Sequence, residues 1–258
     1  MTATLLLKNA LVIGTMDDQL RELANASVFI RGNKVEAVGP ASELPSEADK
    51  VIDMTGHVLI PGLINTHHHM FQSLTRALPA AQNAELFDWL TALFPVWQNI
   101  TPAMQRAATR TAMAELMLSG CTTAADHAYL YVNGTRLDDS VQAAEEMGMR
   151  FHAVRGAMSL GQSQGGLPPD ALVEQDEQAI LREMQRVVED LHDSAADAMI
   201  KVALGPCSPF TVTTDLMREG AALARSCGVG LHTHTAENVK DLAFSQERYG
   251  MTPTEYTE

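Results

Sequence analysis

The sequence predicts an α/β protein in which about five strand–helix units form part of a TIM-like (β/α)8 barrel, with a small β-rich unit before them. From residue 101 onward, short apolar segments alternate with segments of helical periodicity. Polar residues stand repeatedly at the ends of the expected strands, where barrel active sites gather. An open doubly wound sheet is the alternative, but no glycine-rich phosphate fingerprint follows any expected strand.

The composition is that of a globular chain. Its 258 residues are 46% hydrophobic and 19% charged, and the formal net charge is −14. Because affinity for nucleic acid depends on Lys and Arg, this charge argues against a nucleic-acid partner. No apolar run is long enough for a bilayer, and the start lacks the features of a signal peptide. Cys121, Cys207 and Cys227 are too widely spaced to suggest a disulfide framework or a thiolate zinc site. We therefore expect a cytoplasmic protein without nucleic-acid or membrane partners.

Residues 1–57 are expected to form the β-rich unit. Turn residues such as Gly32-Asn33 and Gly39-Pro40 separate short apolar segments, and there is little helical periodicity. The expected strands are residues 4–7, 10–13, 26–30, 34–38 and 51–54.

The next stretch, Val58–Ile64, is almost continuously apolar and leads into three consecutive histidines. The pattern is typical of a strand buried on both faces. Alternation along such a strand would place His67 and His69 on one side and His68 on the other. Two imidazoles at a strand end are a good start for a zinc-type site, and the alternative is a histidine-rich turn.

The segment Phe71–Ile100 is too long for a simple connection, and loops of this length are often functional. We expect a lid or substrate-binding loop that includes Gln72 and Trp89. The alternative is a peripheral helical excursion in which Trp89 and Trp97 only fill space.

Strands and helices then alternate. Thr101-Pro102 is a helix cap followed by proline at the first helical position, and Gly120 ends that helix. A long helix carries Ile180 and Met184 on one apolar face. The other expected helices are residues 137–147, 213–227 and 238–249, and the expected strands are 121–126, 150–155, 199–204 and 229–234.

The last of these strands brings a further imidazole, His234, with Glu237 three positions later. A catalytic metal commonly uses about three protein ligands and leaves a position for water. His67, His69 and His234 would supply three nitrogens, and Glu237 could carry a proton between water and substrate. Alternatively, Glu237 is a carboxylate that stabilises a helix N-terminus. His232 is interpreted as a core or supporting residue, with metal ligand as the less favoured option.

Asp126 and His127 end another expected strand. They could orient a metal ligand or contact a substrate, although as lone residues each is more often structural.

Two motifs resemble a known family. Pro61–His69 resembles the P-G-x-x-[ND]-x-H-x-H signature of the amidohydrolase superfamily, and His234-Thr235-Ala236-Glu237 is similar to the H-x-x-E element of its deaminase and aminohydrolase branch. Residues 67–76, 86–90 and 207–210 look most like those of 8-oxoguanine deaminases. The resemblance implies a β-sandwich portion at 1–57 and a partial barrel with the metal site at 58–258.

The same resemblance implies a metal-dependent hydrolytic deaminase that acts on an aminopurine-like heterocycle, with 8-oxoguanine converted to urate and ammonia. Alternatives are a hydroxyatrazine-type triazine, guanine, isocytosine or cytosine. One divalent metal ion, usually zinc, would be held by His67, His69 and His234 and would generate hydroxide. Glu237 would protonate the adjacent ring nitrogen and help ammonia to leave.

The expected substrate-binding residues are Gln72, Cys207 and Trp89. Gln72 and Cys207 stand where such enzymes recognise the purine edge. Relatives often form dimers, so a homodimer is one expected assembly.

The family also uses a sixth-strand histidine and an eighth-strand aspartate, which would lie beyond Glu258. We therefore expect the chain to be part of an enzyme of roughly 450 residues and to be inactive alone. A non-catalytic protein that keeps a partial metal site is the alternative from a different functional class.

Overall fold

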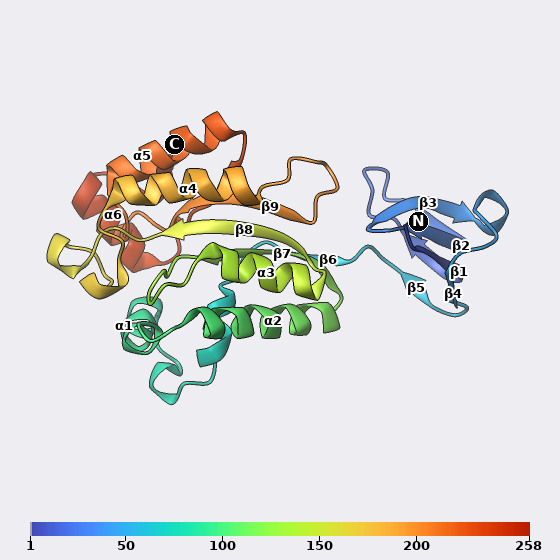
Figure 1. The fold of residues 1–258 in the computed structure, drawn as a ribbon, viewed down its shortest axis with the longest axis horizontal. Coiled ribbons are helices and arrows are strands. Elements are labelled where there is room, and N and C mark those ends of the chain that lie inside the picture. The colour runs from blue at the N-terminus through green and yellow to red at the C-terminus, as the bar shows by residue number, and fades with distance from the viewer. Residues whose placement is uncertain (1) are drawn as a thin grey trace. The chain divides into compact units, whose positions relative to one another are not determined.

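The computed structural model describes residues 2–258 (Figure 1). Contacts within the chain divide it into two compact units, one ending at Leu63 and the other comprising Ile64–Glu258. None of the described helices is long and apolar enough to cross a membrane.

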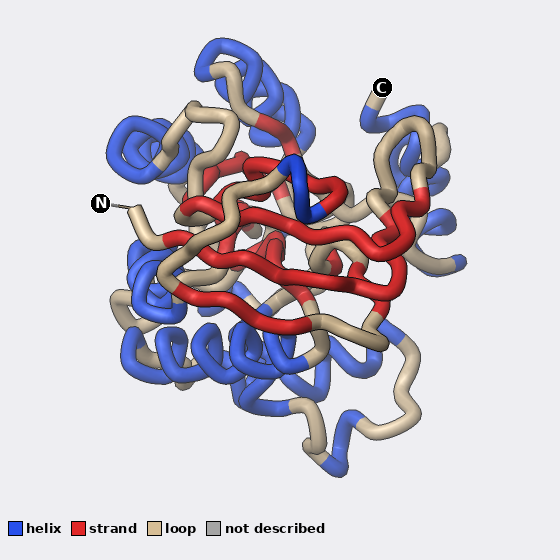
Figure 2. The backbone as a smooth tube through the Cα atoms, turned by 90° about the vertical axis from the view of Figure 1, so that its right-hand side faces the viewer, coloured by secondary structure: helices blue, strands red, loops and turns tan. Residues whose placement is uncertain are grey.

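The first unit is built on one sheet with the strand order β3-β2-β1-β4, in which β5 also pairs with β1 (Figure 2). Within this sheet, the adjacent strands β1 and β2 are antiparallel, as are β2 and β3, whereas β4 and β5 run parallel to β1. The strands expected at residues 4–7 and 10–13 are a single strand, β1, whose pairing register with β2 shifts between Leu7 and Ala10. The bounds are β1 (Thr4–Gly14), β2 (Glu22–Arg31), β3 (Lys34–Pro40), the 3-10 turn η1 (Ala41–Glu43), β4 (Lys50–Asp53) and β5 (Val58–Leu59).

The expectation of one strand buried on both faces from Val58 to Ile64 is wrong. The run is divided between β5 in the first sheet and β6 (Leu63–Asn65) in the second. Pro61 has no N–H to donate to a ladder, so Pro61-Gly62 interrupts the strand. Val58 and Ile64 are 61% and 68% exposed.

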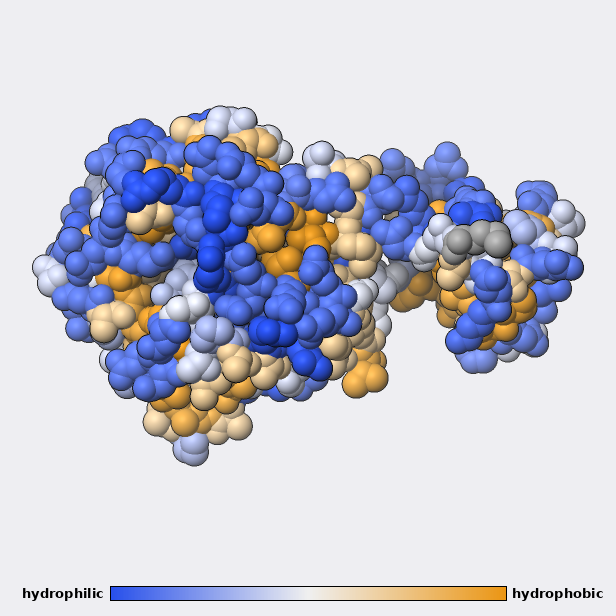
Figure 3. Space-filling model, in the orientation of Figure 1, coloured by the Kyte–Doolittle hydropathy of each residue, from blue (hydrophilic) through white to orange (hydrophobic). Residues whose placement is uncertain are grey.

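Figure 3 shows hydrophobic patches among the hydrophilic surface of each unit.

The second unit contains a curled sheet with the strand order β10-β9-β8-β7-β6. The ladders between β7, β8, β9 and β10 are parallel, and helices connect these strands. This arrangement confirms the expected α/β fold with partial-barrel character. The strands are β7 (Cys121–Ala128), β8 (Arg150–Ala157), β9 (Ile200–Pro206) and β10 (Gly230–Leu231), and the helices are α2 (Pro102–Leu118), α3 (Leu137–Met147), α4 (Glu177–Leu191), α5 (Thr214–Cys227), α6 (Val239–Tyr249) and α7 (Pro253–Thr257).

Local signals explain why the helix boundaries match the sequence. The Thr101 side chain accepts a hydrogen bond from the Met104 backbone N–H at the start of α2. Gly228 ends α5 in the left-handed conformation, with φ of 69°. The expected strand 229–234 is shorter in the structure, because only Gly230–Leu231 pairs regularly with β9. Beyond that, the His232 and His234 backbone N–H groups still bond to Leu204 and Cys207.

The segment between residues 71 and 100 is helical rather than an irregular loop. It contains η2 (Met70–Thr75), η3 (Pro79–Ala81) and α1 (Leu86–Trp97), and the loop before α4 contains η4 (Gln162–Gln164) and η5 (Asp170–Leu172). Trp97 is fully buried, and its indole N–H donates to Thr75 Oγ1 at 3.0 Å. Trp97 therefore fills the core, as the alternative interpretation held.

Candidate metal and substrate site

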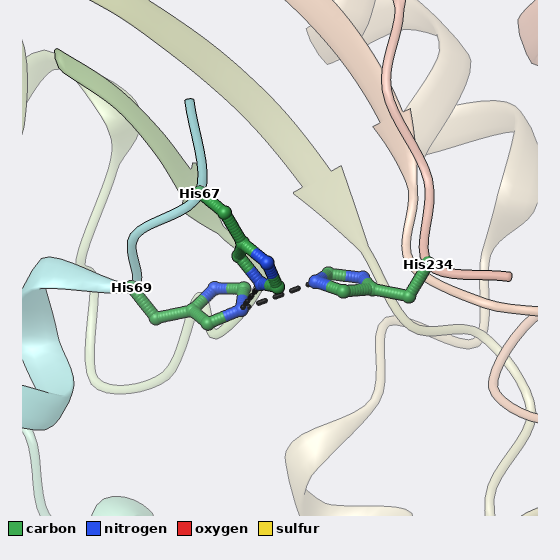
Figure 4. Close-up of side chains that lie close together, drawn as sticks. All are labelled: His67, His69 and His234. Carbon is green, nitrogen blue, oxygen red and sulfur yellow. Dashed lines mark hydrogen bonds between the residues drawn. The ribbon is translucent and has the colours of Figure 1, made fainter. Parts of the chain in front are cut away.

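Three imidazoles converge from two segments that are far apart in the sequence (Figure 4). His67 and His69 follow β6, and His234 follows β10. The His69 Nε2 atom lies 3.2 Å from His67 Nε2 and 3.1 Å from His234 Nε2. The donor atoms of the three side chains all lie within 4.8 Å of one another. The structure thus brings together the three residues that the sequence assigns to the metal.

Backbone carbonyl groups fix two of these rings in one tautomer. His69 Nδ1 lies 2.7 Å from the His127 carbonyl oxygen, and His234 Nδ1 lies 2.8 Å from that of Cys207. A carbonyl oxygen can only accept, so each Nδ1 carries the proton and each Nε2 presents a lone pair. Burial lowers the pKa of His69 to about 3 and that of His234 to about 4. Both rings are therefore neutral at pH 7.

Two Nε2 lone pairs that face each other at 3.1 Å have no proton to share, and this arrangement suits a cation between them. Three neutral imidazole nitrogens are a donor set typical of zinc. The residues present therefore fit a divalent metal ion.

The end of β7 holds the histidine segment in place. The Asp126 carboxylate accepts from the Met70 backbone N–H at 2.7 Å, and the His127 backbone N–H donates to the His68 carbonyl at 2.9 Å. Together with the His69 bond, these contacts fix the backbone on both sides of His69. Asp126 and His127 thus support the site through the backbone, in line with the supporting role considered from the sequence.

His127 and His232 form a second pair of rings behind the site. Their Nδ1 atoms are 2.8 Å apart, and His127 is almost fully buried. Burial lowers the pKa of both imidazoles. His232 belongs to this supporting pair and lies outside the three-histidine group, so the less favoured interpretation of it as a ligand gains no support.

A pocket of about 390 Å³ opens onto the histidines. Apolar and aromatic side chains form much of its wall, as in many small-molecule sites. It contains Gln72, Trp89, Cys207 and Glu237, which are the residues expected to contact substrate or move protons. The full lining is His67, His69, Gln72, Ala84, Leu86, Trp89, Leu90, Tyr129, Cys207, Ser208, Phe210, His234 and Glu237.

Desolvation sets the protonation of two polar groups in this pocket. Glu237 is an exposed residue, but partial desolvation beside the pocket raises the pKa of its carboxyl, and the charge of Asp241 raises it further. Burial also raises the pKa of the Cys207 thiol to about 12, so the thiol stays protonated at neutral pH. Glu237 thus has the environment of a group that holds and releases a proton, whereas Cys207 does not resemble a thiolate nucleophile.

The sequence interpretation missed Tyr129 and Asp241. Tyr129 lies two residues after His127, and the period of two along a strand could have indicated that both face the site. Asp241 lies four residues after Glu237 and is the third residue of α6, a position from which an acidic side chain can reach back to the backbone before the helix.

The chain is similar to a known protein family and to characterised relatives. The model of the Amidohydrolase family matches residues 58–258. An 8-oxoguanine deaminase from Pseudomonas aeruginosa is 42% identical over 97% of this chain and 56% of its own length. An isoxanthopterin deaminase from an unknown prokaryotic organism is 34% identical over 97% of this chain and 54% of its own length.

Among solved structures, an atrazine chlorohydrolase from Arthrobacter aurescens complexed with zinc is similar, with a TM-score of 0.90 and 30% identity over 98% of this chain and 57% of that chain. The chain thus spans little more than half the length of the relatives that it matches. The family match covers the histidine segment, the curled sheet and Glu237, so the chain belongs to the Amidohydrolase family.

Proposed function

We propose that the protein catalyses the metal-dependent hydrolytic deamination of an aminopurine-like heterocycle, and that 8-oxoguanine is its substrate. The main support is the position of Glu237, a carboxyl with a raised pKa, in the same pocket as three converging imidazoles. In the reaction, the oxygen of water replaces the exocyclic amino group, and 8-oxoguanine and water give urate and ammonia. The 42% identity to an 8-oxoguanine deaminase supports this choice of substrate.

The proposed metal ion is one zinc held by His67, His69 and His234. A divalent ion bound there would lower the pKa of a water molecule toward neutrality. The zinc in the similar atrazine chlorohydrolase structure supports this choice.

The chain's own residues then have separate tasks. The Glu237 carboxyl takes the proton from the attacking water and delivers it to the ring nitrogen beside the reacting carbon. Trp89 provides an aromatic wall for a planar ring, and the Gln72 amide and Cys207 thiol meet its polar edge. The apolar lining keeps bulk water away from the reacting carbon.

A substrate panel tests the proposal. The full-length protein is loaded with zinc. Release of ammonia is measured with 8-oxoguanine, guanine, isocytosine and isoxanthopterin, and release of an alkylamine is measured with hydroxyatrazine, whose amino groups are alkylated. We expect the highest kcat/KM for 8-oxoguanine and a loss of at least about 100-fold in Glu237→Gln. Faster turnover of another heterocycle would change the substrate but keep the reaction class.

A triazine is the second candidate substrate, because the triazine-acting relative has a TM-score of 0.90. Absence of ammonia or alkylamine release from every compound, combined with stoichiometric zinc, would instead favour a non-catalytic metal-binding protein.

A further inference from the structure

A buried carboxylate, Asp241, lies four residues beyond Glu237 in the chain. Asp241 has no exposed surface, although it lies in the first turn of α6. Its Oδ2 atom accepts a hydrogen bond from the Glu237 backbone N–H at 3.1 Å. Burial of a carboxylate is unfavourable unless hydrogen bonds or opposite charges compensate for it. The buried position of Asp241 therefore requires a structural explanation.

Helix capping does not supply that reason. The Asn238 side chain already caps α6, accepting from the Lys240 and Asp241 backbone N–H groups at 2.7 and 3.0 Å. In a capping box, the third helical residue bonds to the backbone N–H of the cap residue itself. Asp241 is that third residue, but its bond reaches Glu237, the residue before the cap. The contact therefore acts on the turn that carries Glu237.

That turn has an unfavourable backbone conformation. Ala236, directly before Glu237, has φ of 54°, in the left-handed region that residues with a Cβ atom rarely adopt. Such conformations persist only where the surrounding structure holds them, and they are common at active sites. The Asp241 bond to the next residue provides such a restraint.

We propose that Asp241 is a positioning residue, which holds the Glu237 backbone and the left-handed turn at Ala236 and so directs the Glu237 carboxyl into the pocket. This inference rests on the proposed role of Glu237 as the proton carrier. The negative charge of Asp241 also affects Glu237 directly. It raises the pKa of the Glu237 carboxyl and so favours the protonated form.

Three variants of the zinc-loaded, full-length protein test the proposal. Asp241→Ala removes the acceptor, whereas Asp241→Asn keeps an acceptor oxygen of the same size. Ser245→Ala is the matched control, since Ser245 is equally buried one turn later on α6 and does not line the pocket. All three variants are compared at equal zinc content and equal folded fraction.

In Asp241→Ala we expect kcat to fall by about 100-fold while KM changes by less than about 3-fold, because loss of a positioned proton carrier affects the chemical step. Asp241→Asn should recover kcat to within about 10-fold of the wild type, because the bond to Glu237 is kept. Ser245→Ala should keep the wild-type kcat. A purely structural Asp241 would instead lower the folded fraction in Asp241→Ala and leave kcat per folded, zinc-loaded molecule unchanged, and that result overturns the proposal.

A crystal structure of Asp241→Ala gives a readout that does not depend on activity. We expect Ala236 to leave the left-handed region and the Glu237 carboxyl to move out of the pocket. Retention of both positions would overturn the proposal even if the wild type deaminates no heterocycle. Conversely, a displaced Glu237 in a protein that releases no ammonia would support the positioning role and refute the proposed function.

Discussion

The side-chain amide of Gln72 donates a hydrogen bond to the phenol oxygen of Tyr129 at 2.9 Å, in the wall of the pocket beside the three histidines. Tyr129 is itself fixed, because its ring makes edge contacts with Phe71 and His69 at centroid distances of 5.2 and 5.1 Å. The amide of Gln72 is therefore held in one orientation toward the pocket.

Tyr129→Phe should loosen that orientation and keep the ring contacts. A neutral hydrogen bond contributes about 0.5–1.5 kcal/mol, so we expect kcat/KM for the preferred heterocycle to fall by roughly 2- to 10-fold. The discrimination between 8-oxoguanine and guanine should fall as well. Steady-state kinetics with both substrates checks this.

The matched control is Tyr131→Phe. Tyr131 donates to the Ala128 carbonyl at 2.9 Å and does not line the pocket. Equal losses in the two variants would show that the Gln72–Tyr129 bond has no specific role.

The metal site gives a second prediction. His69→Ala removes the central nitrogen of the three, so we expect bound zinc to fall from about one per chain to near zero, measured by metal analysis after dialysis. Zinc should also raise the melting temperature of the wild type, because a ligand that binds only the folded state stabilises it. His57→Ala, at an exposed histidine in the first unit, should keep both properties. Equal zinc content in the two variants would contradict the assignment.

Local chemistry allowed much of this fold to be predicted. Thr101 and Gly228 mark helix ends through groups within a few residues, so the helices could be located from the sequence. The three histidines could be grouped because strand ends of a parallel sheet meet at one edge. The Gln72–Tyr129 bond joins residues 57 positions apart, and no local pattern specifies such a pair. The Val58–Ile64 segment was predicted to be a buried strand, but it is exposed. An apolar sequence pattern shows which residues could be buried, but it does not show whether other elements of the fold pack over them.

Asp126 gives a prediction about pH. Burial raises the pKa of its carboxyl to about 7, from about 3.9 in an unfolded chain. A raised pKa means that the folded state binds the proton more tightly, so this group's contribution to stability is present below about pH 4 and is lost as the pH rises toward 7. In Asp126→Asn this loss is absent, and the variant should gain stability relative to the wild type between pH 4 and 7. At about 1.4 kcal/mol per pKa unit, the relative gain is a few kcal/mol.

Denaturant unfolding of both proteins at several pH values measures this difference. The amide introduced by Asp126→Asn retains an oxygen that can accept from the Met70 N–H, so the backbone contact is preserved. A constant difference in the free energy of unfolding across the range would show that the Asp126 carboxyl does not titrate there.

Lys240 links the start of α1 to α6 at the side of the pocket. Its Nζ atom lies 3.1 Å from Glu85 and 3.5 Å from Asp88, and 6.0 Å from the centre of the Phe87 ring. Leu86 and Trp89 from the same segment line the pocket. Because these ion pairs are exposed, Lys240→Gln should raise KM by less than about 5-fold. The increase should disappear at high salt, where the wild-type ion pairs are also screened.

Double variants identify the partners. Adding either Glu85→Gln or Asp88→Asn to Lys240→Gln should raise KM no further, because the same contacts have already been lost. A KM that is independent of salt in the wild type would exclude this electrostatic link.

The space around His127 gives the last prediction. A Cβ atom on Gly205 would lie 2.6 Å from Val154 Cγ1 and 2.9 Å from His127 Nε2, closer than real Cβ contacts allow. Gly205→Ala should therefore push the His127 ring and, through its carbonyl bond, disturb His69. We expect the free energy of unfolding to fall by about 1–3 kcal/mol and zinc affinity to weaken. In Gly230→Ala on the adjacent strand, the new atom meets only the Ala203 Cβ at 3.9 Å, an ordinary contact, so that variant should bind zinc as the wild type does. Because the two substitutions add the same methyl group to neighbouring strands, weaker zinc binding in Gly205→Ala alone would support an effect through the crowded space around His127, and equal zinc affinity in the two variants would contradict it.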